Sequence, residues 1–284
     1  MFPISFVKIA LALCFALSLA SGCSSTSRDP VGAITLAPVS EKSASIVVDG
    51  STGAVLQQSS ADLPRIPASL TKMMTLYLVF EALESGRITK TTPIPVSAHA
   101  ASQPPSRLRL KPGQSIDVDT AIKALVVKSA NDVAVALGEY LGGTEEQFAA
   151  RMTAKARQLG LRSTVFRNAS GLPDSQQVTT ARDMALLGLS LRKHHPQYYY
   201  YFGEKDFMFN GKLIRGHNRV LAQVEGADGI KTGYVRASGF NIVTSINDNG
   251  RQLVAVVMGG ETARQRDAQV VSLVNAYLPQ VASR

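Results

Sequence analysis

Strand patterns stand at both ends of this chain, and a long helical stretch separates them. Apolar and β-branched runs predict strands over residues 44–49 and 54–58, and again over 229–235, 239–246 and 252–258. Helical spacing of apolar residues predicts helices over 69–85, 118–127, 131–140, 144–159, 180–193 and 262–278. We therefore predict a mixed α/β fold, with one mostly antiparallel sheet flanked by helices and a helical lobe inserted between its strands.

Turn signals refine this outline. Asp248-Asn249-Gly250 is typical of a tight hairpin between the last two strands. The Pro-rich segment 93–112 and the polar segment 163–179 are expected to be irregular, and the aromatic run 198–202 is expected to pack rather than bind a cofactor. A length of 284 residues suits one large domain or two intimate lobes.

The first 23 residues are typical of an export signal. Lys8 is their one charge, and an apolar run over residues 9–20 leads to Ser21-Gly22-Cys23. The alternative is an uncleaved membrane anchor, for which twelve apolar residues are short. Cys23 is the predicted lipidation site of a bacterial lipoprotein signal, although Ala20 stands where such signals favour Leu, so ordinary cleavage remains an alternative.

Composition bounds the remaining chain. Residues 24–42 are rich in Ser, Thr, Pro and Ala and predict a flexible tether, which leaves 43–284 as the catalytic domain. The net charge of +9 suits an anionic cell-wall polymer, whereas nucleic acid is excluded by the export signal and the lack of a basic-aromatic platform. Cys14 lies inside the signal, so no disulfide is expected. No metal-ligand or nucleotide-binding motif occurs, and no cofactor is expected.

Three short motifs follow one another along the chain: Ser69-Leu70-Thr71-Lys72, Ser129-Ala130-Asn131 and Lys231-Thr232-Gly233. An S-x-x-K match alone is weak, because ordinary usage gives roughly one in a chain this long. Two more indeed occur, from Ser5 in the export signal and from Ser190, near a helix end whose charges and two histidines suggest solvation. Only Ser69 follows Pro67-Ala68 and opens an apolar-periodic helix.

Ser69 and Lys72 supply a nucleophile and its base. A serine hydroxyl reacts only when a base takes its proton. Residues three apart on a helix share a face, with Cβ atoms about 5–6 Å apart. Lys72 must be neutral to act, and lowering its pKa by three units needs about 4 kcal/mol. Burial, the helix N-terminus and a second cation, Lys231, all favour the neutral amine.

The other motif residues suit substrate binding. Ser129 can relay a proton to the leaving group, and the Asn131 amide can bond a substrate peptide. Lys231 and Thr232 can bind a carboxylate, and Gly233 allows close backbone approach. The backbone N–H groups of Ser69 and Tyr234 can form an oxyanion hole.

This set of motifs resembles the penicillin-binding proteins and serine β-lactamases. The strings Pro67–Thr75, Ser129–Asp132 and Asp228–Tyr234, with Gly171–Asp174 and Thr180–Asp183, are similar to those of low-molecular-weight D-alanyl-D-alanine carboxypeptidases over residues 42–280. The resemblance implies a DD-peptidase fold, a periplasmic location and a peptidoglycan stem peptide as substrate, with β-lactams as covalent inhibitors. It also implies that Arg266 helps hold the substrate carboxylate.

Alternatives to a carboxypeptidase remain at this point. A DD-endopeptidase would carry the same motifs. A class A β-lactamase would need a glutamate to activate water, and residues 163–180 contain none. An inactive wall-binding lipoprotein would need neither Lys72 nor Ser129. Many members of the family carry a second β-rich domain and a C-terminal anchor; this sequence ends at Arg284, so we expect membrane attachment only through the N-terminus.

Overall fold

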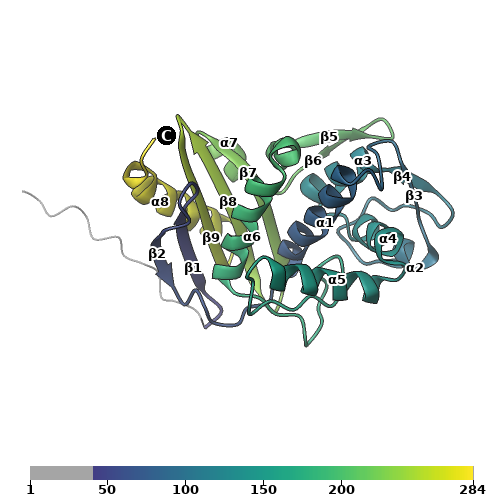
Figure 1. Cartoon of the computed structure of the whole chain (residues 1–284), viewed down its shortest axis with the longest axis horizontal. Helices are drawn as coiled ribbons and strands as arrows, with labels where there is room; N and C mark the ends of the chain where they lie inside the picture. Colours follow the sequence, from purple (N-terminus) through teal and green to yellow (C-terminus); the bar gives the residue numbers. More distant parts are fainter. Residues whose placement is uncertain (1–40, 284) are drawn as a thin grey trace, which may run out of the picture. The chain divides into compact units, whose positions relative to one another are not determined.

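A computed structural model describes residues 41–283, and the predicted signal, Cys23 and most of the predicted tether lie outside them. Strands from both ends of the chain form one five-stranded antiparallel sheet in the order β2-β1-β9-β8-β7 (Figure 1). Its strands are β1 (Ala44–Asp49), β2 (Val55–Ser59), β7 (Ala227–Val235), β8 (Gly239–Asp248) and β9 (Arg251–Gly260). The predicted fold class is confirmed, and β7 and β2 are the two edge strands of the sheet.

Local sequence explains how the sheet closes. β1 pairs with β9 along its whole length, from Ala44 opposite Met258 to Asp49 opposite Leu253, which joins the two ends of the chain. β8 turns into β9 through Asn249 and Gly250, both with positive φ, as the predicted hairpin requires. Successive side chains of β8 and β9 point to opposite faces of the sheet, and both sets are buried.

Each face of the sheet is covered by a helix. α8 (Ala263–Tyr277) packs on one face through Val270 and Val274, and α6 (Ala181–His194) covers the other. Thr180 and Thr262 cap these helices, accepting hydrogen bonds from the Asp183 and Gln265 backbone N–H groups. The helix of the first motif and the helical lobe lie on the α6 side.

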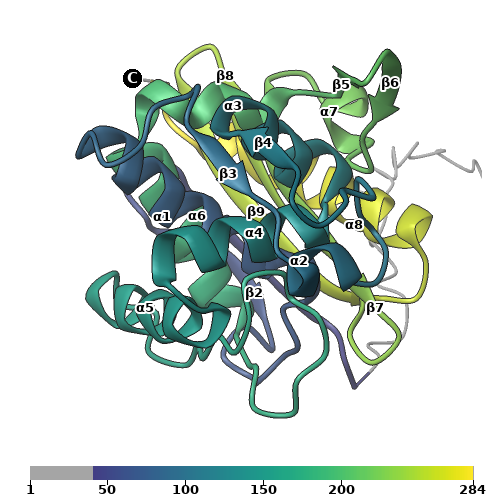
Figure 2. The same cartoon turned by 90° about the vertical axis from the view of Figure 1, so that its right-hand side faces the viewer.

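The helical lobe stands beside β7 (Figure 2). Its elements are η1 (Ala68–Thr71), α1 (Lys72–Glu84), α2 (Ala98–Ser102), α3 (Val118–Lys123), the π-helical turn η2 (Ala124–Lys128), α4 (Asn131–Gly142) and α5 (Glu145–Gln158). Helix α5 begins at the predicted cap, where Thr144 Oγ accepts from the Gln147 N–H. Thus the predicted helix from residue 69 is a 3-10 turn followed by an α-helix.

Several elements were not predicted. The Pro-rich segment contains β3 (Pro93–Pro95), paired with β4 (Ser115–Asp117), and the short α2. A second hairpin, formed by β5 (Asp206–Phe209) and β6 (Lys212–Arg215), follows α6 and η3 (Pro196–Gly203). The remaining elements are α7 (Val220–Gln223) and η4 (Leu278–Gln280). Short strands of three or four residues give too little periodicity to stand out in a sequence.

Two expectations about α6 and η3 had different outcomes. The aromatic run does pack, since Tyr199, Tyr201 and Phe202 are buried against Phe80 and its neighbours. The prediction that the end of α6 is solvated is wrong in part. His195 is only 2% exposed and lies 2.8 Å from Glu84 Oε1, because an ion-pairing partner from α1 makes its burial possible.

No helix within residues 41–283 is both long and apolar enough to cross a bilayer. The same residues hold no cluster of His, Cys, Asp and Glu that could bind a metal ion.

Candidate active site

Ser69 and Lys72 meet where η1 passes into α1. Lys72 is the first residue of α1, and its Nζ lies 3.3 Å from Ser69 Oγ. Ser69 is partly exposed, while the Lys72 side chain is completely buried. The predicted pair is therefore in contact, with the hydroxyl open to solvent and the amine behind it.

Two further oxygens hold the Lys72 amine. Its Nζ donates to Asn131 Oδ1 at 2.7 Å and to the Ser170 carbonyl oxygen at 2.5 Å. Asn131 belongs to the second motif, at the start of α4, whereas Ser170 lies in the polar loop before α6 and was not predicted. The amine is thus fixed by three segments that are distant in sequence.

The surroundings of Lys72 favour its neutral form. Burial lowers the pKa of Lys72 well below its ordinary value, and the positive charge of Lys231 lowers it further. Asp132 and Glu145 oppose this shift by attracting the protonated amine. Since burial is the largest effect, these surroundings favour the neutral amine, the form that can accept a proton from Ser69.

Ser129 stands at the end of the π-helical turn in a left-handed conformation, with φ of 58°. Its buried Oγ has no hydrogen-bond partner among residues 41–283. A buried hydroxyl without a partner is costly, and such groups are concentrated at functional sites. The side-chain amide of Asn131 is held by the Pro104 carbonyl oxygen at 2.9 Å.

β7 supplies the third motif. Lys231 is buried and donates to the Thr232 carbonyl oxygen at 2.8 Å. Burial, with Arg266 nearby, lowers its pKa to about 7. Lys231 is therefore poised between a charged and a neutral state in the absence of a bound anion.

Gly233 brings β7 against the turn that carries the nucleophile. A Cβ on this residue would lie 3.1 Å from the Ser69 backbone nitrogen and 3.2 Å from the Pro67 carbonyl oxygen. The missing side chain thus allows η1, rather than substrate alone, to approach the strand. The next side chain, Tyr234, is 52% exposed and stacks on Phe240 at a centroid distance of 4.2 Å.

Arg266, from the first turn of α8, is buried and firmly placed. Its Nη1 donates to the Asn241 carbonyl oxygen at 2.8 Å, and its Nε lies 2.8 Å from Asp267 Oδ1. His217 and Arg219 line the same end of the cleft, although the sequence analysis did not single them out. Arg219 and Arg266 thus bring positive charge to the cleft, next to the Asp267 carboxylate, while burial and nearby cations lower the pKa of His217.

Most predicted residues line one cleft of about 420 Å³: Ser69, Ser129, Asn131, Thr232, Gly233, Tyr234 and Arg266. Lys72 and Lys231 are buried behind its wall. Cys23 lies outside the described residues. The structure thus brings every predicted catalytic and substrate-binding residue to one place.

Asp132 is a further residue that the motifs did not reveal. Its buried carboxylate accepts hydrogen bonds from four backbone N–H groups, those of Leu108, Arg109, Leu110 and Val133. The loop that it holds includes Pro105 and Ser106, which form a wall of the cleft. An aspartate inside the apolar run of α4 is the signal that could have indicated this role.

Similarity to known proteins agrees with this geometry. The sequence profile described as D-alanyl-D-alanine carboxypeptidase matches residues 33–262. D-alanyl-D-alanine carboxypeptidase DacA of Escherichia coli is 36% identical over 236 residues, which are 81% of this chain and 59% of that protein. The chain spans about 60% of the length of the curated relatives that it matches.

Solved structures share the fold. D-alanyl-D-alanine carboxypeptidase DacD from Francisella tularensis superposes with a TM-score of 0.81 at 30% identity, covering 83% of this chain and 70% of that one. Penicillin-binding protein D2 from Listeria monocytogenes, in its ampicillin-bound form, gives 0.72 at 27% identity, covering 84% and 98%. With three motifs joined in one cleft and a profile match over most of its length, this chain belongs to the D-alanyl-D-alanine carboxypeptidase family.

Proposed function

We propose that the protein is a serine-type carboxypeptidase that removes the terminal D-alanine from peptidoglycan stem peptides through an acyl-enzyme on Ser69. The observation that carries this proposal is the contact between Lys72 Nζ and Ser69 Oγ, 3.3 Å apart, in a cleft whose far end is cationic. A partly exposed hydroxyl beside a buried amine of lowered pKa is an activated nucleophile.

The acylation step uses these groups in order. Ser69 Oγ attacks the carbonyl carbon of the penultimate D-alanine, and its proton passes to Lys72 Nζ. The negative charge on the carbonyl oxygen is met by the backbone N–H groups of Ser69 and Tyr234. The C–N bond then breaks, and the leaving amine takes the proton from Lys72 through Ser129, whose free hydroxyl suits a relay.

In deacylation, water takes the place of the serine as nucleophile and Ser69 becomes the leaving group. Water attacks the ester on Ser69, its proton passes to Lys72, and the proton then returns to Ser69 Oγ as the C–O bond breaks. The released D-alanine leaves room for this water. A β-lactam keeps its leaving amine tethered in the cleft, so its ester should persist. The ampicillin-bound form of the Listeria monocytogenes penicillin-binding protein supports β-lactams as inhibitors here.

β7 provides the platform for an extended peptide. It pairs with β8 on one side only, and its residues Thr232, Gly233 and Tyr234 line the cleft. A peptide lying along this edge would gain main-chain hydrogen bonds. Its terminal carboxylate would lie near Thr232, Lys231 and Arg266, which argues for cleavage of the last residue rather than of an internal bond.

Two other hydrolytic activities are separated by one experiment. D-alanine release is measured from a D-Ala-D-Ala pentapeptide and from its C-terminal amide, beside penicillin turnover. The carboxypeptidase proposal expects rapid release from the free acid only and slow penicillin turnover. Equal cleavage of the amide would favour a DD-endopeptidase, and fast penicillin turnover without D-alanine release would favour a β-lactamase.

The nucleophile is tested by mass. Incubation with penicillin should add one adduct to the intact protein. Ser69→Ala should abolish the adduct, and Ser190→Ala, which alters the other S-x-x-K match in α6, should retain it. An adduct that survives in Ser69→Ala would contradict the assignment.

We propose further that the chain is exported to the periplasm and anchored by a lipid on Cys23. The apolar run before Cys23 and the polar segment after it support this proposal. Cys23→Ser should move the protein from the membrane fraction to the soluble periplasmic fraction. A wild-type protein found there without acyl mass would favour an ordinary signal peptide.

A further inference from the structure

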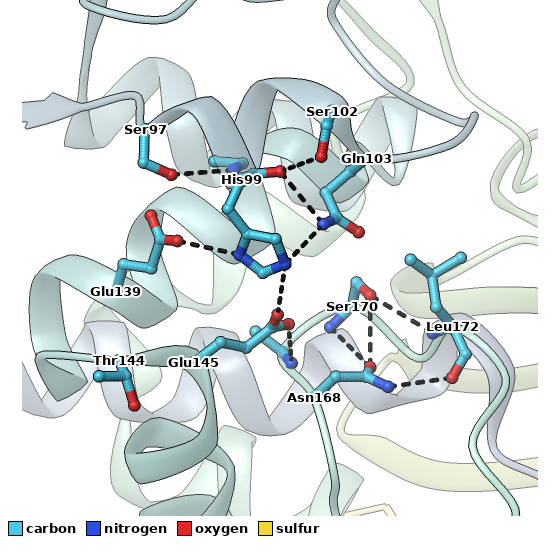
Figure 3. Close-up of polar contacts among 12 residues, drawn as sticks. Ser97, His99, Ser102, Gln103, Glu139, Thr144, Glu145, Asn168, Ser170 and Leu172 are labelled. Carbon is cyan, nitrogen blue, oxygen red and sulfur yellow. Dashed lines mark hydrogen bonds and ion pairs between the residues drawn. The ribbon is translucent and has the colours of Figure 1, made fainter.

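Three titratable side chains from different helices meet in the helical lobe: His99 of α2, Glu139 of α4 and Glu145 of α5 (Figure 3). His99 Nδ1 lies 3.1 Å from Glu139 Oε1, and His99 Nε2 lies 3.8 Å from Glu145 Oε2. None of these residues lines the catalytic cleft. The cluster therefore has no direct part in the reaction described above.

Glu145 nevertheless touches the loop that fixes Lys72. Its Oε1 accepts from the Ala169 N–H at 3.0 Å, and the next residue, Ser170, gives its carbonyl oxygen to Lys72 Nζ. Asn168 Oδ1 tightens the same turn by accepting from the Ser170 N–H at 3.2 Å (Figure 3) and from the Gly171 N–H at 2.7 Å. The Ala169-Ser170 segment thus connects the Glu145 carboxylate to the Lys72 amine, through one hydrogen bond at each end.

Glu145 and Lys72 also interact through their charges. The Glu145 side chain is only 11% exposed, and burial raises its pKa, while the Ala169 N–H and His99 favour the ionised form. Glu139 and the neighbouring Glu146 oppose ionisation. When it is ionised, Glu145 raises the pKa of Lys72, together with Asp132 and against burial and Lys231.

We propose that Glu145 is a positioning residue for the acylation reaction: it holds the Ser170 carbonyl against Lys72 and supplies a negative charge that sets when Lys72 loses its proton. This inference rests on the proposed function, because it assigns Lys72 as the base. The His99 ring is 53% exposed and lies between the two carboxylates, and its Nε2 also lies 3.1 Å from Gln103 Nε2.

The sign of the effect follows from electrostatics. A carboxylate near Lys72 favours the ammonium, so removing that charge lets the amine become neutral at lower pH. Glu145→Gln keeps an oxygen that can accept from the Ala169 N–H but removes the charge. Glu145→Ala removes both the charge and the acceptor. Glu146→Gln, at an exposed position one residue along the first turn of α5, is the matched control.

The experiment measures the second-order rate of acylation by a fluorescent penicillin from pH 4.5 to 8. Glu145→Gln should move the acid limb of the pH profile to lower pH. When the rate of each protein is divided by its own plateau, the Glu145→Gln value one pH unit below the wild-type midpoint should be at least about twofold the wild-type value. Glu145→Ala should lower the plateau by about tenfold, and Glu145→Gln should recover most of that loss. Glu146→Gln should keep the wild-type plateau, and it should not move the acid limb to lower pH, because Glu146 only opposes the ionisation of Glu145.

Each arm can overturn the inference. An unshifted acid limb in Glu145→Gln would show that its charge does not act on Lys72, even where Glu145→Ala fails to fold. A wild-type plateau in a folded Glu145→Ala would show that the carboxylate does not hold the loop. A wild-type protein that penicillin does not acylate at any pH would instead contradict the proposed function.

Discussion

Gly171 lies directly against Ala68, so that a Cβ on Gly171 would stand 1.9 Å from the Ala68 carbonyl oxygen. Both residues have positive φ, 85° for Gly171 and 48° for Ala68. Ala68 precedes the nucleophile, and Gly171 follows the residue whose carbonyl holds Lys72. The loop that fixes the base is therefore fitted directly to the turn that carries Ser69.

Gly171→Ala should separate these two segments. The added methyl group cannot share space with the Ala68 carbonyl oxygen, so the loop with Ser170 must move away from the turn with Ser69 and Lys72. Lys72 then loses the carbonyl that fixes it, and we expect penicillin acylation to fall by about 100-fold or more. Gly160→Ala is a matched control, because its φ of 83° imposes the same strain but no atom lies within 4 Å. Equal losses of acylation in the two variants would show that backbone strain, rather than the contact, is responsible.

Lys72→Arg should be nearly inactive although it keeps the positive charge. A guanidinium does not lose its proton in a protein, so it cannot serve as base. We expect acylation to fall by about 10²–10⁴-fold. Thermal unfolding should be recorded beside it to show that the larger side chain is accommodated, and a folded variant within tenfold of wild type would mean that another group is the base.

Binding of the substrate carboxylate should weaken as pH rises. Lys231 has its pKa lowered to about 7, so it is charged below this pH and neutral above it. In Ser69→Ala, which separates binding from chemistry, the Kd of a D-Ala-D-Ala peptide measured by calorimetry should rise by up to about tenfold from pH 6 to pH 9. Lys231→Met in the same background should bind weakly with little pH dependence. A flat profile in the parent would exclude Lys231 as an anion ligand.

Asp132→Asn should destabilise the fold and the wall of the cleft. The amide cannot accept at its nitrogen, so some of the four N–H groups lose their partner, and we expect a loss of about 2 kcal/mol or more in the free energy of unfolding. Urea unfolding provides the measurement. Asp174→Asn is the control, since that carboxylate is exposed and accepts only from the Gln176 N–H. A similar small loss in both would mean that solvent replaces the bonds of Asp132.

Features with local causes could be predicted from the sequence. Ser69 and Lys72 are three residues apart, and one helical turn brings them together whatever the rest of the chain does. The Asn249-Gly250 turn likewise follows from the conformations that these two residues tolerate. The sheet could be predicted because its strands are long and strongly apolar.

Features that depend on partners distant in the chain could not be predicted from the sequence. Ser170 reaches Lys72 across 98 positions, through a backbone carbonyl that every residue possesses, so no side-chain pattern marks it. His195 looked solvated because its partner, Glu84, is 111 positions away. The pairing of β3 with β4 depends on three residues in each strand, within a segment whose prolines suggested an irregular path.

The unpaired edge of β7 has a cost as well as a use. An exposed edge invites strands of other molecules to join the sheet, which is a route to aggregation. Here residues 229–233 of β7 are buried, and Thr232 and Gly233 line a cleft of about 420 Å³ together with a wall that includes Pro105, Ser106 and Ser129. A single short extended peptide is narrow enough to enter, whereas the edge of another folded sheet would bring its neighbouring strands and helices against that wall. If peptides bind as proposed, a cleft of this size would admit a small extended peptide to β7 and exclude the sheet of a neighbouring protein.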